Sequence, residues 1–194
     1  KKLMIYWYSV KTIFSLSNKQ QILISIILPT YNHAKFLKKA IQSVINQSYL
    51  RWELIIIDNN SKDGTFEIVN SYIDPRIRYI KIRNNGIIAA SRNAGIFASS
   101  GSWIAFIDSD DWWTQDKLSK SVEYINSNNY DLIYHDLFLV SKPNQNSFKK
   151  LAKSRNLFSP ILKVILLNGN GILNSSVIVK KDLLQEVGLI SCDT

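Results

Sequence analysis

The chain has 194 residues, of which 46% are hydrophobic and 20% charged, and this ordinary globular usage excludes disordered, collagen-like and disulfide-scaffold proteins. The single cysteine, Cys192, excludes an intrachain disulfide and a Cys-x-x-Cys metal site, which fits a reducing, cytosolic compartment. The formal net charge of +9 indicates affinity for phosphates, anionic membranes or nucleic acid, without choosing among them.

Residues 1–21 are interpreted as a leader ahead of a single domain at 22–194. The leader combines lysines with tyrosine and tryptophan, a composition that suits a membrane interface. We expect either an interfacial or partner-docking helix, or a segment packed on the domain's own core. The apolar runs 22–28 and 161–167 are shorter than the ~20 residues that cross a bilayer, so no transmembrane helix is predicted.

Strands and helices alternate along the first part of the domain. Apolar runs predict strands at 22–28, 52–57, 78–82 and 103–107. Helical spacing and small residues predict helices at 34–47, 66–72 and 89–99, with Thr65 capping the second. Uninterrupted apolar strands joined by helices are typical of a parallel sheet that is covered on both faces. The sequence therefore predicts an α/β, Rossmann-like, mostly parallel sheet with helices on both faces, which binds ligands beyond the carboxyl ends of its strands.

The remainder of the domain has a less regular pattern. We expect, in chain order, a helix at 117–126, a strand at 131–140, a loop at 142–155, a helix at 158–167, a strand at 175–179 and a helix at 181–187. The absence of acidic residues between Asp136 and Asp182 makes much of this part basic. We interpret that charge either as a solvated basic face or as a surface for anions.

Three carboxylates follow the strand predicted at 103–107. They belong to Asp108, Asp110 and Asp111. Crowded carboxylates repel one another unless a cation is present, and two carboxylates one residue apart can hold Mg²⁺ or Mn²⁺ while diphosphate oxygens and water complete the shell. The pattern favours a metal site at Asp108 and Asp110, although an acidic triplet in a solvated turn is the alternative.

Three further residues are candidates for the same edge of the sheet. Asp58 ends the second strand and can accept hydrogen bonds from a uracil imide or a ribose, although an Asx turn explains it equally well. Tyr31 follows the first strand and offers an aromatic face on which a base can stack. Arg92 can pair with diphosphate oxygens. Each residue taken alone has an ordinary structural explanation.

The order of these motifs resembles family 2 glycosyltransferases. The resemblance is carried by ISIILPTYNHAKFLKKAIQSVINQSYLRWELIIIDNNSKDGT, by residues 86–93 and by GSWIAFIDSDDWW, and it runs from Ile24 to about Leu118. A weaker similarity to the family's acceptor-side segment continues through GNGILNSSVIVKKDLLQEVG. The resemblance implies a GT-A fold with a nucleotide-sugar-binding part at 22–118 and a partial acceptor-side part at 119–194.

The resemblance also assigns roles. It implies a donor-binding set, a DXD metal motif, and sugar transfer with inversion from a nucleotide diphosphate sugar, with a UDP-sugar favoured. The donor-binding residues are Tyr31, Asp58, Arg92, Asn93, Asp108 and Ser109, and the ligands for Mn²⁺ or Mg²⁺ are Asp110 and Asp108. The acceptor is expected to be a glycan or a lipid-linked glycan of surface polysaccharide synthesis, with peripheral contact at the inner face of the membrane.

The sequence departs from the family in two places. Asn59 stands where many members carry a second Asp, which leaves the preferred nucleotide open. The family's catalytic base usually follows the segment that ends here at Gly188–Thr194, so the base is expected beyond residue 194 in a chain that is truncated at its C-terminus. A noncatalytic sugar-nucleotide-binding protein is therefore the alternative function.

Two other classes fit the sequence less well. A dinucleotide-dependent oxidoreductase needs a G-x-G-x-x-G turn after the first strand, and Leu28–Asn32 has none. Nucleic-acid binding accounts for the positive charge but leaves the carboxylates at the strand ends without a purpose, so no nucleic-acid partner is predicted.

Overall fold

The structure is a computed structural model that describes residues 21–127, 130–140, 150–152, 154 and 172–192. The leader up to residue 20 and the helix predicted at 158–167 lie outside these described residues. Within them, no helix is both long enough and apolar enough to cross a membrane.

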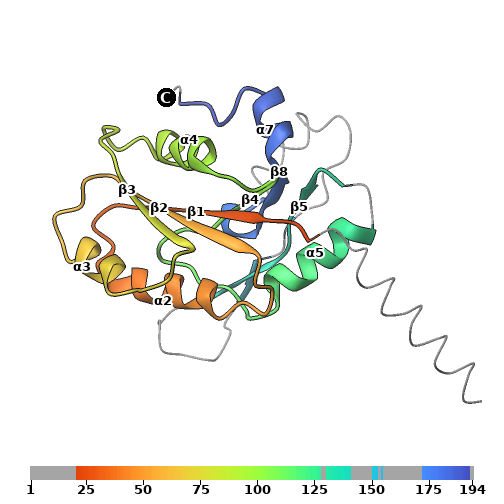
Figure 1. The fold of residues 1–194 in the computed structure, drawn as a ribbon, viewed down its shortest axis with the longest axis horizontal. Helices are drawn as coiled ribbons and strands as arrows, with labels where there is room; N and C mark the ends of the chain where they lie inside the picture. The colour runs from red at the N-terminus through yellow and green to blue at the C-terminus, as the bar shows by residue number, and fades with distance from the viewer. Residues whose placement is uncertain (1–20, 128–129, 141–149, 153, 155–171, 193–194) are drawn as a thin grey trace, which may run out of the picture.

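The described strands form a six-stranded, mostly parallel sheet, as predicted (Figure 1). Its order is β3-β2-β1-β4-β8-β5. The parallel strands are β1 (Ile24–Thr30), β2 (Trp52–Asp58), β3 (Ile77–Lys81) and β4 (Trp103–Phe106). The antiparallel strand β8 (Ile178–Lys180) pairs with both β4 and β5 (Leu132–Ile133). The carboxyl ends of the four parallel strands therefore share one edge.

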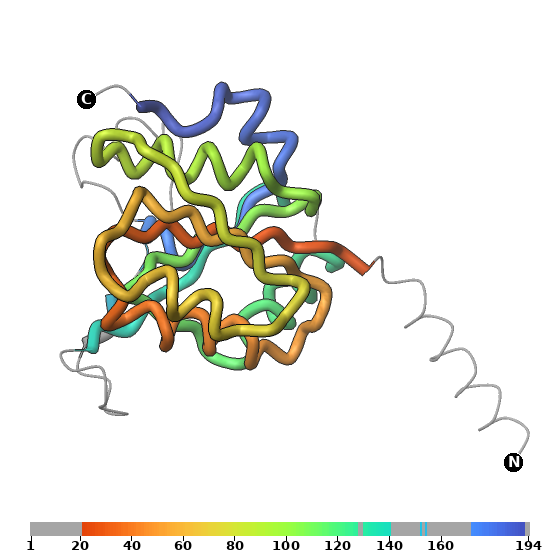
Figure 2. Tube along the Cα trace, turned by 60° about the vertical axis from the view of Figure 1, so that its left-hand side comes forward, coloured from red at the N-terminus to blue at the C-terminus, as the bar shows by residue number. Residues whose placement is uncertain are grey.

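Helices cover both faces of this sheet, which confirms the predicted layering (Figures 1 and 2). One face carries α2 (Ala34–Ile45), α3 (Thr65–Asn70) and α5 (Lys117–Ser127). The other face carries α4 (Ile88–Ala98) and the short α7 (Lys181–Glu186). This arrangement explains why β1 and β2 are apolar at almost every position, since residues on both faces of each strand are covered.

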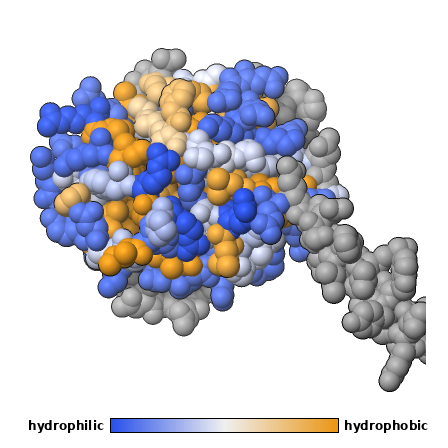
Figure 3. Space-filling model, viewed as in Figure 1, coloured by the Kyte–Doolittle hydropathy of each residue, from blue (hydrophilic) through white to orange (hydrophobic). Residues whose placement is uncertain are grey.

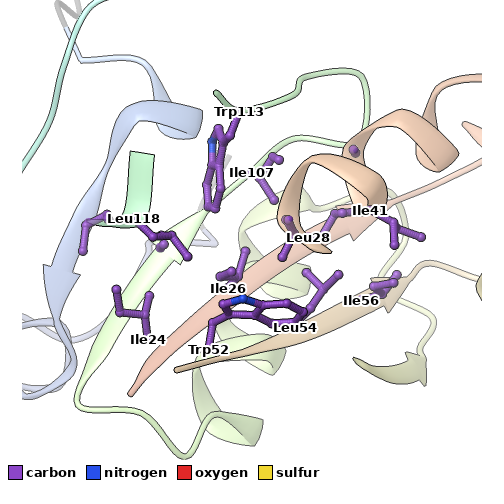
Figure 4. Close-up of a cluster of buried hydrophobic side chains, with 14 of the residues drawn as sticks. Ile24, Ile26, Leu28, Ile41, Trp52, Leu54, Ile56, Ile107, Trp113 and Leu118 are labelled. Carbon is purple, nitrogen blue, oxygen red and sulfur yellow. The ribbon is translucent and has the colours of Figure 1, made fainter. Parts of the chain in front are cut away.

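The larger part of the core lies between the sheet and α2 (Figure 4). Ile26, Leu28 and Leu54 point to this side and are fully buried, together with Ile41 of α2. Ile27 points the opposite way and packs in a second cluster against α4. Each of these buried aliphatic side chains contributes about 1.5–3 kcal/mol relative to an exposed one. The two clusters hold the sheet edge in place from both sides.

The surface in the view of Figure 3 mixes hydrophilic and hydrophobic residues. Exposed apolar side chains occur on several elements, for example Phe66 on α3 and Phe97 on α4. A folded protein cannot cover its whole surface with polar atoms, so scattered apolar residues need no special function.

Three sequence-based expectations need correction, two of them after the first four strands. The strand predicted at 131–140 is divided into β5 and β6 (Leu137–Leu139), and β6 pairs with β7 (Lys150–Ala152), which falls in the predicted loop. Asp136, between the two strands, accepts hydrogen bonds from the backbone and hydroxyl of Ser154 instead of continuing a strand. The strand predicted at 175–179 is a short 3-10 helix, η1 (Asn174–Ser176), followed by β8.

The predicted cap of α3 is the third correction. Thr65 is the first residue of the helix and is buried, so it is not the N-cap. The N-cap residue is Gly64, which has no side chain that could cap the helix. Asp63 performs this task from outside the helix, because its carboxylate accepts hydrogen bonds from the backbone and hydroxyl of Thr65, at 3.1 and 2.6 Å. The same carboxylate accepts from the backbone N–H of Ala34, which joins the first turns of α2 and α3.

Glu53 joins three segments at the amino end of the sheet. Its carboxylate accepts hydrogen bonds from the Ser25 hydroxyl at 2.6 Å, the Ser100 backbone N–H at 2.5 Å and Arg78 at 3.3 Å. Burial alone would raise the pKa of Glu53, but the hydrogen bonds from Ser25, Ser100 and Arg78 outweigh burial and leave the pKa below its usual value.

Replacing Glu53 by Gln is expected to lower the free energy of unfolding at pH 7 by about 1–2 kcal/mol, because charge-assisted hydrogen bonds become neutral ones. A lowered folded-state pKa gives stability that is present above the unfolded pKa and is lost as the pH falls through the folded pKa. The deficit should therefore shrink in strong acid. Urea unfolding at pH 7 and pH 2.5 measures it, with the exposed Glu123→Gln as control. An equal deficit at both pH values would contradict this account.

Candidate functional site

The loops after the four parallel strands enclose a pocket of about 260 Å³. Its walls come from the ends of β1 and β2, from the loop that leads from β3 into α4, and from the loop after β4. The lining residues are Pro29, Thr30, Tyr31, His33, Asn59, Asn84, Gly86, Ile88, Ser91 and Ser109. Ligands of parallel α/β sheets bind in this kind of crevice. We call it the strand-end pocket.

Tyr31 and Thr30 give the strand-end pocket a mixed character. Tyr31 is about half exposed (56%) and lines the pocket, so its ring is accessible to a ligand. The Thr30 hydroxyl is buried, and no described residue hydrogen-bonds to it. A buried hydroxyl without a partner is costly, and a ligand in the pocket can supply one.

Asp58 lies behind the pocket lining. The residue is 1% exposed, and its carboxylate accepts hydrogen bonds from the backbone and hydroxyl of Ser61 and, at 2.5 Å, from the hydroxyl of Tyr79. Burial and the neighbouring Asp58 charge both raise the pKa of Tyr79, so this hydroxyl stays protonated and continues to donate. Asp58 therefore has a local structural role, although it bonds the backbone three positions on and not two as in an Asx turn, while the neighbouring Asn59 lines the pocket.

The residues of the acidic loop after β4 face different partners. Asp108 accepts a hydrogen bond from Arg92 at 2.8 Å, and the two side chains form an ion pair. The Ser109 hydroxyl lies 2.8 Å from Nδ1 of His33, which joins the loops after β4 and β1. Asp110 is exposed, and its carboxylate has no hydrogen bond or ion pair with any described residue. Only Asp110 points its charge outward without a protein partner.

Asp111 points inward, toward a segment that lies more than sixty positions later in the chain. The Ser175 hydroxyl accepts a hydrogen bond from the Asp108 backbone N–H at 3.0 Å and also hydrogen-bonds to Asp111. Trp113 donates to the backbone carbonyl of Ser175 at 2.9 Å. Burial raises the pKa of Asp111, the charges of Asp108 and Asp110 raise it further, and the Ser175 hydrogen bond partly opposes them. Through these hydrogen bonds of Ser175, helix η1 holds the acidic loop in position.

Arg92 and Asn93 are neighbours on α4 but contact different parts of the protein. The Arg92 side chain is 9% exposed and pairs with Asp108, while its Nε has no partner among the described residues. Asn93 donates to the carbonyl of Ile190 at 2.8 Å and accepts from the N–H of the same residue at 3.1 Å. Neither side chain lines the strand-end pocket. Arg92 orients Asp108, and Asn93 holds the segment after α7 against α4.

The chemistry of the acidic loop fits a divalent cation that arrives together with phosphate ligands. Asp110 and the second oxygen of Asp108 are hard oxygen donors, as Mg²⁺ and Mn²⁺ prefer. Within the described part of the chain, no group of three or more His, Cys, Asp or Glu side chains is placed to hold a metal. If Asp108 and Asp110 held such a cation, phosphate oxygens and water would have to complete its coordination shell.

Several pocket residues were missed by the sequence analysis. His33, Asn84 and Ser91 line the pocket, and Ser175 supports the acidic loop. Asn84 is oriented by hydrogen bonds to the Ile87 carbonyl and the Ser91 hydroxyl. A possible signal for Asn84 was its place after a predicted strand, the same position that identified Tyr31 and Asp58. Ser175 had no local signal, because its role depends on contacts distant in sequence.

A pocket at the ends of parallel strands is where α/β proteins of this layout typically bind their ligands. The family model described as glycosyl transferase family 2 matches residues 25–188. The chain therefore belongs to the family 2 glycosyltransferases, as its motifs indicated.

Curated relatives of the chain are bacterial glycosyltransferases. The putative teichuronic acid biosynthesis glycosyltransferase TuaG of Bacillus subtilis is 40% identical over 105 residues, which cover 53% of this chain and 42% of the relative. The UDP-Glc:alpha-D-GlcNAc-diphosphoundecaprenol beta-1,3-glucosyltransferase WfgD of Escherichia coli is 34% identical over 143 residues, covering 73% of this chain and 55% of the relative. The chain spans about half the length of these relatives.

Solved structures share the fold. S. aureus TarS 1-349 in complex with UDP-GlcNAc matches with a TM-score of 0.69 and 21% identity, covering 87% of this chain and 48% of that one. The mannosyltransferase PcManGT from Pyrobaculum calidifontis, in complex with GDP-Man and Mn²⁺, matches with a TM-score of 0.61 and 19% identity, covering 89% of this chain and 48% of that one. At these identities the likeness establishes the GT-A type of sheet.

Proposed function

We propose that this chain binds a nucleotide diphosphate sugar, preferably a UDP-sugar, and transfers the sugar with inversion to a glycan or lipid-linked acceptor in surface polysaccharide synthesis. One observation carries the proposal. The strand-end pocket, with the open ring of Tyr31, lies on the same sheet edge as the outward-facing carboxylate of Asp110. The names of TuaG and WfgD, a polysaccharide enzyme and an enzyme with a lipid-linked acceptor, support the acceptor class.

In this proposal the base and ribose occupy the strand-end pocket. Tyr31 stacks on the base, and the side chains near Thr30 and Asn59 supply polar contacts. The Arg92 guanidinium fixes Asp108 through their 2.8 Å contact, so that this carboxylate faces the diphosphate in one orientation. Asn93 acts indirectly, through the segment after α7 that it holds.

Asp108 and Asp110 would hold Mn²⁺ or Mg²⁺ beside the diphosphate. The cation supplies positive charge that stabilises the leaving nucleoside diphosphate. Asp111 supports the loop through its contact with Ser175. The residue that deprotonates the acceptor hydroxyl is left unassigned.

Calorimetric titration of UDP, GDP and UMP, each with Mn²⁺ and with EDTA, tests the donor site. We expect metal-dependent binding that is selective for the diphosphates and strongest for UDP. A complete lack of binding under all these conditions would reject the donor site. The alternative of a noncatalytic sugar-nucleotide-binding protein shares the binding result and differs only in turnover, which hydrolysis or transfer of a UDP-sugar measures.

Tyr31→Ala is expected to weaken UDP binding by about 1–3 kcal/mol, because base–aromatic stacking is worth that much per base. Loss of stacking should reduce UDP and GDP affinity alike, while the dependence on Mn²⁺ is kept. The exposed Tyr124, which is outside the strand-end pocket, provides the control substitution Tyr124→Ala. Unchanged UDP affinity in Tyr31→Ala would show that the base lies elsewhere.

Contact with the inner face of the cytoplasmic membrane is a further part of the proposal. No acidic residue occurs before Glu53, and α2 exposes Lys35 and Lys38 next to the strand-end pocket's β1 loop. Such lysines add about 1 kcal/mol each near an anionic surface. Vesicles with anionic lipid should retain the protein at low salt and release it at high salt. Equal retention by neutral vesicles would contradict an electrostatic contact.

A further inference from the structure

A second and larger pocket, of about 710 Å³, is lined by residues of α5, β5 and the segments beside them, and it shares no residue with the strand-end pocket. Its lining is Thr114, Asp116, Lys117, Lys120, Ser121, Tyr124, Tyr130, Leu132, Ile133, Tyr134 and His135. We call it the α5 pocket. The acidic loop after β4 leads directly into α5, so the two pockets are neighbours along the chain.

Lys117 is the most unusual residue of the α5 pocket. It is 5% exposed, and its ammonium group contacts only the Ser176 carbonyl at 3.5 Å and the face of the Trp113 ring at 4.4 Å from the centroid. Among the described residues no carboxylate forms an ion pair with it, because the adjacent Asp116 pairs with Lys120 at 2.5 Å. Burial lowers the pKa of Lys117 to about 7. A buried ammonium group without a counter-ion is costly, and either loss of its proton or a ligand that brings negative charge removes this cost.

His135 supplies a second polar group whose partner is missing. Its Nδ1 lies 2.7 Å from the Asp136 carbonyl, so Nδ1 carries the proton, and in the neutral ring Nε2 is an acceptor. Nε2 is buried and has no hydrogen-bond partner among the described residues. Burial lowers the pKa of His135, and the nearby charge of Lys117 lowers it further. Nε2 is therefore suited to accept a hydrogen bond from a hydroxyl group of a bound ligand.

The rest of the lining suits a sugar. Tyr124 and Tyr130 are 59% and 52% exposed, and Leu132 and Ile133 add apolar contacts. A tyrosine ring can pack on an apolar face of a ligand while its hydroxyl hydrogen-bonds to a polar edge, and sugar rings have both an apolar face and polar hydroxyl groups. Aromatic and aliphatic walls with a few buried polar groups are the usual composition of a small-molecule site, and 710 Å³ is within the usual range of size.

We propose that the α5 pocket binds a sugar that carries a phosphate or diphosphate group, with Lys117 contacting the phosphate and Nε2 of His135 accepting a hydrogen bond from a sugar hydroxyl. Under the proposed function, on which this assignment of role rests, the ligand is the phosphate-bearing end of the acceptor. The binding itself requires neither a metal nor the strand-end pocket. The sugar phosphate can be free or attached to a lipid, and the test separates these two sources.

The test titrates N-acetylglucosamine 1-phosphate into the full chain in EDTA, and repeats the titration with Asp110→Asn, in which metal-dependent donor binding is removed. Equal binding to both proteins is expected. Lys117→Met keeps the bulk of the side chain and should lower the affinity at least tenfold, whereas Lys81→Met, at an exposed lysine outside both pockets, should not change it. Vesicles that contain polyprenyl-diphosphate N-acetylglucosamine are the second probe, with the same variants.

Each outcome decides the proposal. Binding of the soluble sugar phosphate that is lost in Lys117→Met supports the α5 pocket and a free ligand. Retention only on vesicles, again lost in Lys117→Met, supports the pocket and a lipid-linked ligand. No binding to either probe, or binding that Lys117→Met leaves unchanged, overturns it. If thermal melting shows that Lys117→Met is unfolded, His135→Asn replaces it, with an expected loss of at least fivefold. If the protein binds UDP with Mn²⁺ but binds neither probe, the donor-site proposal stands and only the α5-pocket proposal is rejected.

Discussion

Asp110→Asn is expected to remove the metal-dependent part of UDP affinity, a loss of about 100-fold or roughly 3 kcal/mol. The substitution keeps the shape of the side chain but replaces a charged oxygen ligand with a neutral amide, which divalent cations bind less well. The fold should not suffer, because the exposed Asp110 carboxylate has no partner among the described residues. Its charge only adds to the crowding with Asp108 and Asp111, so the free energy of unfolding should stay equal or rise slightly.

Titration of UDP with Mn²⁺ and with EDTA measures this effect, and urea unfolding of the same protein checks its stability. Asp182→Asn is the matched control, since Asp182 is also exposed but lies on α7. It should bind UDP as the unchanged protein does. If Asp110→Asn binds UDP with unchanged affinity in Mn²⁺, the metal ligands are elsewhere. If it binds normally in EDTA but gains nothing from Mn²⁺, the site assignment holds.

The sheet was predictable because its signal is local. The apolar runs in β1, β2 and β4 are nearly continuous, broken only by Ser25 in β1 and Glu53 in β2 before the strand ends, and a parallel sheet that is covered on both faces has this pattern. The helices between them force parallel connections, so the shared edge followed without knowledge of any contact. The later strands were predicted poorly for the opposite reason. The two- and three-residue strands β5 and β6 are set by pairing with distant partners, which no periodicity reveals.

The candidate site was predictable residue by residue but not pair by pair. Tyr31 directly follows β1 and Ser109 lies in the loop after β4, and both line the strand-end pocket. Arg92 was expected to contact the diphosphate of the donor, and in the structure it pairs with Asp108. The sequence alone does not tell whether an arginine will pair with a carboxylate of the protein or with a phosphate of the ligand. Its role toward the donor stays a prediction. Asn93 was assigned with Arg92 because they are adjacent, yet adjacent residues on a helix point about 100° apart and contact different neighbours.

Gly101→Ala is expected to destabilise the protein more than any other single methyl addition discussed, by about 3 kcal/mol or more. A Cβ at this position would lie 2.5 Å from the backbone oxygen of Leu23 and 2.7 Å from the Ser25 hydroxyl. Backbone cannot give way here, because the following residues of β1 are paired with β2 on one side and β4 on the other. The clash would also separate the Gly101 N–H from the Ser25 hydroxyl, 2.8 Å away, and disturb the Ser25–Glu53 hydrogen bond.

Thermal and urea unfolding of Gly101→Ala measure this loss, and a protein of this length should melt about 6–12 °C lower for 3 kcal/mol. Gly64→Ala is the control, since a Cβ there would meet no atom within 4 Å and its φ of −74° suits any residue. That variant should stay within about 0.5 kcal/mol of the parent. Because Gly101 is at the opposite end of β4 from the acidic loop, the folded fraction of Gly101→Ala should still bind UDP. Loss of binding at full foldedness would mean that the amino end of the sheet sets the geometry of the strand-end pocket.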